Sequence, residues 1–571
     1  MSSFKSYGKV SENEQADLSA RLKIRKRISI ISLSSFVLIL VIVSSVLGTQ
    51  LQSNGKSKSN NVDTNTNSIS KSIKAICAVT LYPNSCYTSL SDASNSSRLD
   101  PEALFKLSIQ VAMAGLSKAA DHFSKYKIDG VFEPMATAAL ENCRDLLDLA
   151  MDHLNSALSS HIDATLLEIV DDLKTWLSAA GTYQQTCIDG LENASGEIKG
   201  IVSKFLTNST EYTSNSLAII TGISNVADSF KLRRLMACSS SKLPKWVPKN
   251  YRKLVQTPVA KIKADGVVAK DGTGKYKTIN AALNAVPEKS KKRFVIYVKK
   301  GVYYENVRVN KTKWNVMMVG DGMDATVVSG RLNFIDGTPT FSTATFAAFG
   351  VGFIARDMGF RNTAGPAKQQ AVALMTSSDQ SIFYRCRIDA FQDSLYTQSL
   401  RQFYRECNIY GTVDFIFGNG AAILQNCNIL PKVPMPGQQN TITAQGKVDP
   451  NQNTGIVIQN STIWPAGNLT SVSTYLGRPW KPYSTTLYLR STMGSLIHPN
   501  GWLPWNGTDA PDTIFYSEFE NFGPGSSTKN RVKWKGLKNI TLNEASRFTV
   551  KSFINGDKWI YTASVTFKSG L

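Results

Sequence analysis

A short pattern that returns three times in residues 370–430 constrains the fold of this 571-residue chain more than any other feature. Cys386, Cys407 and Cys427 lie 21 and 20 residues apart, and each is followed two residues later by Ile. Fainter echoes occur at 356–360 and 459–463. A period of about 20 residues, with β-branched and aromatic runs broken by Gly, Asn and Asp, predicts a parallel β-helix whose coils contribute short strands.

Two pairs of polar residues share this period. Gln370 leads to Gln392 in 22 residues, and Asp393 leads to Asp414 in 21. Residues one coil apart in a parallel β-helix stack about 4.8 Å apart, so both pairs are expected on one face of consecutive coils. Asp414 lies in the apolar run 412–417, where an unpaired acid is costly. The carboxylates are therefore expected to be paired or catalytic, the alternative being a turn or a solvated polar ladder.

The net charge of +21 predicts a polyanionic partner. Nucleic acid is one candidate, but the sequence carries no RNA-recognition, zinc-finger or helix-turn-helix signature. An acidic polysaccharide or an anionic surface fits the same charge. We therefore do not expect nucleic acid to be the partner.

The N-terminus predicts export. Residues 1–27 form a polar, cytosolic tail that ends in a basic cluster, and 28–48 contain an uncharged apolar segment long enough to span a bilayer. We expect a signal anchor or a long signal peptide, so that the rest of the chain enters the secretory pathway and becomes extracellular. Residues 49–72 predict a flexible linker. Glycosylation sequons, which fit this route, occur at Asn95, Asn193, Asn208, Asn310, Asn460, Asn468, Asn506 and Asn539.

Residues 73–236 predict an all-α domain. Asp100 begins a helix with Pro and Glu in its first turn, followed by apolar residues at helical spacing. Further helical stretches are expected at about 135–158, 161–191 and 212–235, which gives a bundle of about four long helices.

Four cysteines of this domain predict two disulfides in an exported chain. The favoured connectivity is Cys77–Cys86 and Cys143–Cys187, and Cys238 has no obvious partner. A zinc site is the alternative, but no CxxC pair is present. The histidines of the domain are expected on helix surfaces: His122, His153 and His161.

Long motifs then identify a family. They are DGTGKYKTINAAL (271–283), FIARDMGFRNTAGP (353–366), KQQAVAL (368–374), QDSLY (392–396), GTVDFIFGN (411–419), QGKVDPNQNTGIVIQN (445–460), YLGRPW (475–480) and GW (501–502). The segment that carries them resembles plant pectin methylesterases, and the helical domain with its cysteines resembles plant invertase and pectin methylesterase inhibitors. The resemblance implies a mainly β protein, with a right-handed parallel β-helix catalytic domain at 259–571 behind an all-α four-helix bundle.

The resemblance also implies a mechanism for hydrolysing the methyl esters of pectin. Two like charges on adjacent coils push their pKa values apart, which leaves one carboxyl protonated. Arg478 can keep the other ionised, and by resemblance this is Asp414, the nucleophile. Asp393 is then the general acid and base. Gln370 and Gln392 are the expected oxyanion donors.

Other chemistries leave weaker signals. A Ser-His-Asp triad is not expected, because 259–571 contains a single histidine, His498, and no G-x-S-x-G elbow. A polysaccharide lyase would need a calcium site and an Arg base, and a polygalacturonase a cluster of three acids. A non-enzymatic pectin-binding wall protein is a further alternative. No metal or cofactor is expected.

Four aromatic residues match family positions that line the sugar groove: Tyr396, Phe417, Trp480 and Trp502. Aromatic faces suit the apolar faces of galacturonate rings, although any of these side chains could instead belong to the core. The expected substrate is methyl-esterified pectin.

The resemblance further implies proteolytic maturation. The dibasic pairs Arg233-Arg234 and Arg252-Lys253 lie at or within the Pro- and Lys-rich linker 237–258, where a subtilisin-like protease would cut; an uncut linker is the alternative. The bundle is expected to inhibit or chaperone the enzyme until then. The mature enzyme is expected to be a monomer of the cell wall that meets proteinaceous pectin methylesterase inhibitors, with membrane contact only through 28–48 before processing.

One further disulfide is left open. Cys386 and Cys407, or Cys407 and Cys427, are expected about one strand spacing apart, within the Cα separation that a disulfide accepts. Only one of the two pairs can form, and stacked free thiols are the alternative.

Overall fold

The structure is a computed structural model that describes residues 63–94, 100–125, 134–160, 165–192, 196–229, 263–563 and 565–571. The chain divides into a unit Met1–Asn67 and a unit Ser68–Leu571. Several predicted features lie outside the described residues: the basic tail, the signal anchor, both dibasic pairs, Cys238 and His161. None of the described helices is long and apolar enough to cross a membrane.

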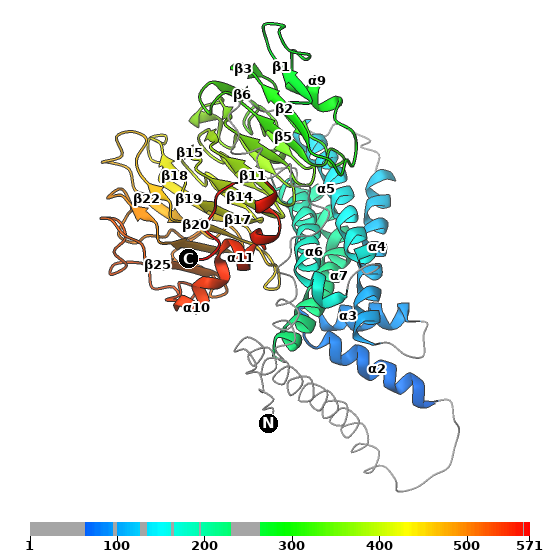
Figure 1. The fold of residues 1–571 in the computed structure, drawn as a ribbon. Helices are drawn as coiled ribbons and strands as arrows, with labels where there is room; N and C mark the ends of the chain where they lie inside the picture. The colour runs from blue at the N-terminus through cyan, green and yellow to red at the C-terminus, as the bar shows by residue number, and fades with distance from the viewer. Residues whose placement is uncertain are drawn as a thin grey trace, which may run out of the picture. The chain divides into compact units, whose positions relative to one another are not determined.

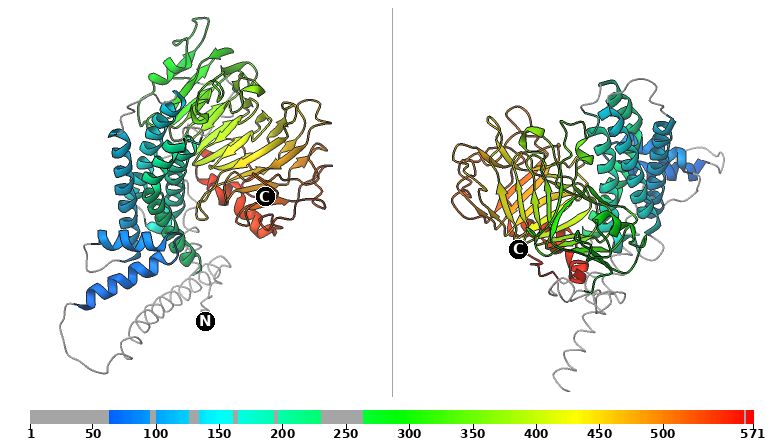
Figure 2. Two further views of the ribbon diagram at one scale, coloured as in Figure 1. Left: turned by 180° about the vertical axis from the view of Figure 1, so that it is seen from behind. Right: turned by 90° about the horizontal axis from the view of Figure 1, so that it is seen from above.

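The helical domain contains four long helices that run side by side (Figures 1 and 2). Its helices are α2 (Asp63–Cys77), α3 (Pro83–Ala93), α4 (Pro101–Lys125), α5 (Pro134–Ser159), α6 (Leu166–Asp189) and α7 (Gly196–Ser229). Pro101 and Pro134 occupy the first helical positions of α4 and α5, where their missing N–H costs nothing. Thr165 and Glu168 form a capping box at the start of α6. The predicted four-helix bundle is confirmed.

Two boundaries differ from the prediction. The last helix begins at Gly196 and not near 212, because Ile198, Val202 and Leu206 recur at intervals of four and are all buried. The predicted linker 49–72 is wrong for its final residues, which belong to α2, a helix whose Ile73 is only 1% exposed.

Both bundle disulfides are confirmed. Cys77–Cys86 joins the end of α2 to α3, and Cys143–Cys187 joins α5 to the last turn of α6. The second bond therefore fixes the position of α6 against α5, which matters because α6 contacts the β domain.

The second half of the chain forms three sheets, and in each of them a strand pairs in parallel with the equivalent strand of the next coil. Sheet A contains β1 (Gly266–Val268), β2 (Phe294–Val298), β5 (Val316–Val319), β8 (Ile354–Arg356), β11 (Ser381–Tyr384), β14 (Arg401–Arg405), β17 (Ala421–Gln425), β20 (Gly455–Gln459), β23 (Thr485–Leu489) and β25 (Phe515–Phe519). Sheet B contains β3 (Gly301–Tyr304), β6 (Thr326–Gly330), β9 (Gly359–Asn362), β12 (Arg387–Asp389), β15 (Asn408–Gly411), β18 (Asn428–Pro431), β21 (Thr462–Ile463) and β24 (Thr492–Met493). Sheet C contains β4 (Val307–Val309), β7 (Phe346–Ala348), β10 (Leu374–Thr376), β13 (Leu395–Thr397), β16 (Ile416–Gly418), β19 (Asn440–Gln445) and β22 (Thr474–Gly477). This topology is a parallel β-helix.

The repeat seen in the sequence marks one corner of each coil. A single residue with positive φ follows sheet A strands and turns the chain into sheet B. These corner residues are Asp357, Arg385, Glu406, Asn426, Asn460, Arg490 and Glu520. Non-glycine residues seldom adopt this left-handed conformation, so its recurrence indicates that the corner geometry is imposed by the stacked coils.

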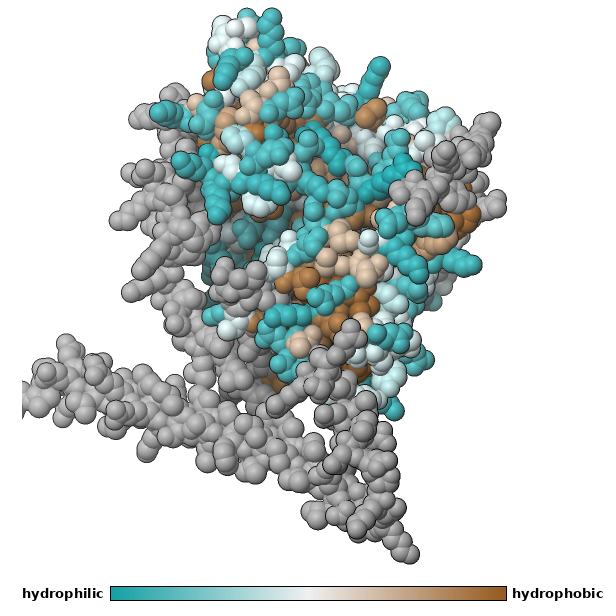
Figure 3. All heavy atoms as spheres, turned by 90° about the vertical axis from the view of Figure 1, so that its right-hand side faces the viewer, coloured by the Kyte–Doolittle hydropathy of each residue, from teal (hydrophilic) through white to brown (hydrophobic). Residues whose placement is uncertain are grey.

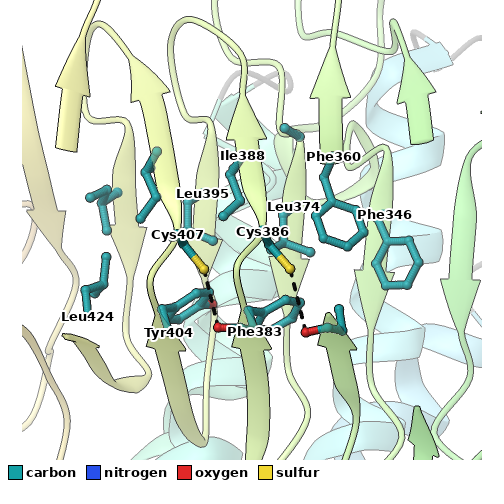
Figure 4. Close-up of a cluster of buried hydrophobic side chains, with 14 of the residues drawn as sticks. Phe346, Phe360, Leu374, Phe383, Cys386, Ile388, Leu395, Tyr404, Cys407 and Leu424 are labelled. Atoms are coloured by element: carbon teal, nitrogen blue, oxygen red, sulfur yellow. Dashed lines mark hydrogen bonds between the residues drawn. The ribbon is translucent and has the colours of Figure 1, made fainter. Parts of the chain in front are cut away.

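Cys386, Cys407 and Cys427 follow three of these corners and stack inside the β-helix as free, buried thiols. The possible Cys386–Cys407 disulfide is therefore absent. The thiols of Cys386 and Cys407 instead point to backbone carbonyls of the preceding coils, beside the stacked rings of Phe383 and Tyr404 (Figure 4).

The C-terminal segment covers sheet A. The short helices α10 (Leu542–Ala545) and α11 (Val550–Phe553) bury Ala545 and Val550 against apolar residues of that sheet. A short helix near the start of the domain, α9 (Ile279–Asn284), packs against β1 and β4. The face of the molecule drawn in Figure 3 is largely hydrophilic, with hydrophobic residues in smaller patches.

Candidate active site

One row of side chains crosses four neighbouring strands of sheet C, β10, β13, β16 and β19. The strand register places Met375, Tyr396, Phe417 and Ala444 level with one another on consecutive coils. Tyr396 and Phe417 stack with ring centroids 4.2 Å apart. We call these four side chains the aromatic row.

Asp393 and Asp414 lie at equivalent positions, each two residues before its sheet C strand. The pairing of Leu395 with Ile416 and the hydrogen bond from Asp393 N–H to the Val413 carbonyl show that the register continues through both acids. The two acids therefore occupy equivalent positions on adjacent coils, as their 21-residue spacing predicts. Both acids have positive φ, at 64° and 50°. Such a conformation costs about 1–3 kcal/mol at a non-glycine residue and is concentrated at functional sites.

Arg478 holds Asp414 in a two-pronged ion pair. Its Nε lies 2.9 Å from Oδ1 and its Nη2 lies 2.7 Å from Oδ2. The Thr441 hydroxyl donates to Oδ1 at 2.6 Å and accepts a bond from the Asp414 N–H. Arg478 directly follows β22, two coils beyond Asp414, so its side chain reaches across the intervening coil. The Asp414 carboxylate thus accepts two bonds from a guanidinium and one from a hydroxyl.

Asp393 has the opposite environment. Burial and then the charge of Asp414 raise the pKa of Asp393 well above its ordinary value, and Arg478 opposes this only in part. Among the described residues, none hydrogen-bonds to the Asp393 carboxyl. Two neighbouring carboxyls with such different surroundings can divide between them the roles of an anion and an acid.

The two glutamines are less symmetric than predicted. Gln392 directly precedes Asp393, but the strand register places Ala371, and not Gln370, level with it. The Ala371 N–H donates to the Gln392 carbonyl. The Gln370 Oε1 is buried without a hydrogen-bond partner. The separation of 22 residues exceeds the strand offset of 21 by one, so the two glutamines are not level with each other on their coils.

The predicted sugar-binding aromatics separate into two groups. Trp480 is half-buried and lies 6.2 Å from Phe417, at the end of the aromatic row. Trp502 is 1% exposed, donates to Glu518 at 3.1 Å and packs on Tyr516. The prediction that Trp502 lines a groove is therefore wrong, because its ring belongs to the core of the β-helix.

Trp505 is a residue of the site that the sequence reasoning missed. Its half-buried ring lies over the Arg478 guanidinium at 4.4 Å and 6.4 Å from Trp480. Stacking of this kind restrains an arginine while leaving its N–H groups free. The sequence shows a second tryptophan three residues after Trp502, but the spacing does not show which of the two rings packs into the core of the β-helix.

The aromatic row is buried by the bundle. Met375, Tyr396, Phe417 and Ala444 form one continuous apolar cluster with the bundle core. Tyr396 and Phe417 are only 4% and 5% exposed as a result. Ion pairs border this contact, with the cation on the β-helix and the acid on the bundle: Arg308–Asp145, Lys311–Asp148, Lys311–Asp152, Arg401–Asp172 and Lys481–Asp189.

His153 lies at the same contact and not on the helix surface as expected. Its ring stacks on Tyr183 of α6, and its Nδ1 is buried without a partner. Burial lowers the pKa of His153 to about 4, although the charges of Asp379 and Asp152 oppose this, and Lys311 adds to the lowering. His153 is thus neutral in the folded chain at neutral pH.

Comparison with known proteins identifies both halves. The Pectinesterase family model matches residues 265–557, and the Plant invertase/pectin methylesterase inhibitor model matches 71–219. A protein of Arabidopsis thaliana described as a putative pectinesterase/pectinesterase inhibitor 24 is 54% identical over 99% of both chains. The chain belongs to the pectinesterase family. A probable pectinesterase/pectinesterase inhibitor 46 of the same plant is also 54% identical over 99% of both chains, and pectinesterase 3 of Phaseolus vulgaris is 47% identical.

The β-helix also matches a solved pectinesterase. The pectin methylesterase from carrot is 52% identical, with a TM-score of 0.54, and the match covers 54% of this chain and 99% of that one. The predicted right-handed parallel β-helix is thereby confirmed, as is a carboxylic ester hydrolase that demethylesterifies pectin. These relatives also imply a function in the plant cell wall. Lyase, galacturonase and purely binding functions find no support among them.

Proposed function

We propose that this pectinesterase hydrolyses the C6 methyl esters of homogalacturonan by covalent catalysis with Asp414 as the nucleophile. The observation that carries the proposal is the two-pronged pairing of Arg478 with Asp414, next to a second carboxyl, Asp393, that is buried and unpaired. One carboxyl is thus available as an anion and the other as a proton donor.

The reaction then follows in two halves. An Asp414 oxygen attacks the ester carbonyl to give a tetrahedral oxyanion, and as this collapses Asp393 gives its proton to the departing methoxide, which leaves as methanol. The acyl-enzyme is an anhydride between galacturonate and Asp414. Asp393, now a carboxylate, takes a proton from a water molecule, which attacks the galacturonate carbonyl. The free acid leaves, and both aspartates return to their starting states.

The oxyanion needs donors, and Gln392 is the first candidate because it directly precedes Asp393. Gln370 is the second, since its amide also carries N–H donors and it lies on the coil before Gln392. One donor of this type typically lowers the activation free energy by about 2.7–4 kcal/mol. Tyr396, Phe417 and Trp480 would contact the sugar rings.

We further propose that residues 73–236 keep the enzyme inactive until a subtilisin-like protease cuts at Arg233-Arg234 or Arg252-Lys253. Support comes from the burial of the aromatic row against the bundle core, which leaves no room there for a polysaccharide. The released domain would act as a monomer outside the cell, in the wall, where separate inhibitor proteins can regulate it.

The experiment measures methanol release from methyl-esterified pectin by the full chain, with a specific protease site placed in 237–258. Cut wild type should be active, and uncut wild type should be slower. Asp414→Asn should abolish activity in the cut form, whereas Asp512→Asn, which removes an exposed acid paired with Lys535, serves as the matched control. Full activity of Asp414→Asn would refute the proposed nucleophile, and equal rates for cut and uncut wild type would refute the proposed inhibition. Shortening of the polymer would indicate a lyase or galacturonase.

A further inference from the structure

Helix α6 lies against three buried amide side chains of the β-helix. Gln398 directly follows β13, Asn419 directly follows β16, and Gln452 lies in the loop after β19. They are 0%, 4% and 3% exposed. Gln398 and Asn419 lie two residues beyond Tyr396 and Phe417, on the side away from the aspartates, and Gln452 continues this second row through a hydrogen bond with Asn419. We call them the amide row.

The β-helix itself fixes the orientation of these amides. The Oε1 of Gln452 accepts from the backbone N–H groups of Val448 and Asp449 and from Asn419 Nδ2. The Oε1 of Gln398 accepts from the Ser377 hydroxyl at 2.6 Å. With the carbonyl oxygens held in this way, the NH₂ groups are left to point outward.

All three NH₂ groups find an acceptor on α6. Gln398 donates to the Thr186 hydroxyl at 3.1 Å, and Asn419 donates to the Thr182 hydroxyl at 2.8 Å. Gln452 donates to the Ser178 carbonyl at 3.1 Å and to Thr182 at 3.3 Å. Departure of the bundle would remove the α6 acceptors from all three amides, and only Asn419 would keep an acceptor, Gln452 Oε1, in the β-helix.

Two cations accompany the amide row. Lys481 pairs with Asp189 near the end of α6 at 2.6 Å. Arg401 uses Nε and Nη2 for Asp379 within the β-helix, and its Nη1 reaches Asp172 near the start of α6 at 2.6 Å. The β-helix therefore presents amide donors flanked by two cationic groups, and α6 presents oxygen acceptors flanked by two carboxylates.

We propose that the amide row, with Lys481 and Arg401, is a binding strip for de-esterified galacturonate residues, and that α6 occupies it in the uncut chain by presenting the same functional groups. A galacturonate chain carries hydroxyl oxygens and, once its esters are removed, carboxylates. The methyl-esterified chain offers the oxygens but not the charge, so the cations favour the product form. The proposal rests on the pectinesterase function proposed above, and it adds a site that distinguishes free from esterified uronate.

The test uses the full chain with the cleavable linker, cut and then freed of its bundle, and polygalacturonate as the probe. Lys481→Gln should weaken polygalacturonate binding on the order of tenfold, and should weaken binding of fully methyl-esterified pectin less. Gln398→Leu provides a second variant that leaves the charge unchanged and removes one amide donor. Lys535→Gln is the matched control, because it removes the same charge from a side chain that is 79% exposed and pairs with the exposed Asp512.

A second arm leaves the cut bundle in place. Polygalacturonate should displace it from cut wild type at lower concentrations than methyl-esterified pectin does. The proposal is overturned if Lys481→Gln and Gln398→Leu both bind polygalacturonate as tightly as Lys535→Gln, or if the two polymers displace the bundle equally well. Methanol release by cut wild type separates these failures from a failure of the esterase mechanism, since activity would persist without the strip.

Discussion

Replacement of Asp393 by Asn tests the division of labour between the two acids most directly. The side chain keeps its size, and the protonated acid and the amide are both neutral, so the buried site should tolerate the change. What is lost is the proton that leaves with methanol. General acid catalysis is typically worth 10²–10⁴-fold, or about 2.7–5.4 kcal/mol of barrier.

The size of the loss should depend on the leaving group. Methoxide is a poor leaving group that needs the proton, whereas a nitrophenolate leaves without one. Cut Asp393→Asn should therefore lose about 10²–10⁴-fold in the rate constant of the first half-reaction on methyl-esterified oligogalacturonate but far less on the nitrophenyl ester, measured in each case from the burst of released alcohol. Equal losses on both esters would contradict the assignment of Asp393 as the acid.

The same variant carries a pH signature. Burial and the charge of Asp414 raise the pKa of Asp393, so the folded protein binds this proton more tightly than the unfolded chain does. The stability that this contributes is complete below the ordinary carboxyl pKa and is lost as pH rises through the raised value. The Tm of Asp393→Asn should therefore rise relative to the Tm of wild type as the pH increases. A constant difference in Tm between the two proteins across that range would show that Asp393 does not titrate as described.

Three further predictions concern the surroundings of the site. Trp505→Ala should lower kcat about tenfold with little change in KM, because the Arg478 guanidinium loses its stacking partner, and Trp505→Phe should restore most of the rate; an effect on KM alone would make Trp505 a sugar contact instead. Cys143→Ser removes the disulfide to Cys187, 44 residues further along the chain, and should lower the free energy of unfolding of the bundle by about 4 kcal/mol in chemical denaturation. Methanol release by the uncut chain should then rise, and unchanged release would show that α6 does not need this disulfide to stay in place. His153 has a depressed pKa of about 4, so its contribution to bundle stability is complete above pH 6.5 and is lost, up to about 3 kcal/mol, as the pH falls towards 4; His153→Phe should flatten the bundle's stability in that window, and an unchanged pH profile would contradict this.

The sequence was most informative where one period governs both backbone and chemistry. The cysteine spacing of 21 and 20 residues equals the coil length, and the separation of Asp393 from Asp414 equals the strand offset at that point, so the two acids are in register. The glutamines differ by one residue from the same offset. Gln370 stands one residue before the position equivalent to Gln392, and a shift of one residue along a strand turns a side chain to the other face.

Other features could not be predicted because they depend on contacts between distant segments. Trp502 and Trp505 are equally aromatic and three residues apart, and only the packing of a loop against the β-helix decides which becomes core. The pairing of Asp189 with Lys481 joins residues almost 300 positions apart, with no motif in common. Helix α2 was not predicted because its sequence is mostly polar, and a few apolar side chains are enough to pack a helix against a bundle.

The reach of Arg478 across an intervening coil limits how this solenoid can vary in length. Coils added or removed at either end leave the reacting groups in their places, since each turn rests only on its neighbours. An extra turn between β16 and β22 would instead carry the guanidinium one strand spacing further from Asp414, about 4.8 Å, and beyond hydrogen-bonding range. Coils can therefore be added at either end of the β-helix without disturbing the site, but not between β16 and β22.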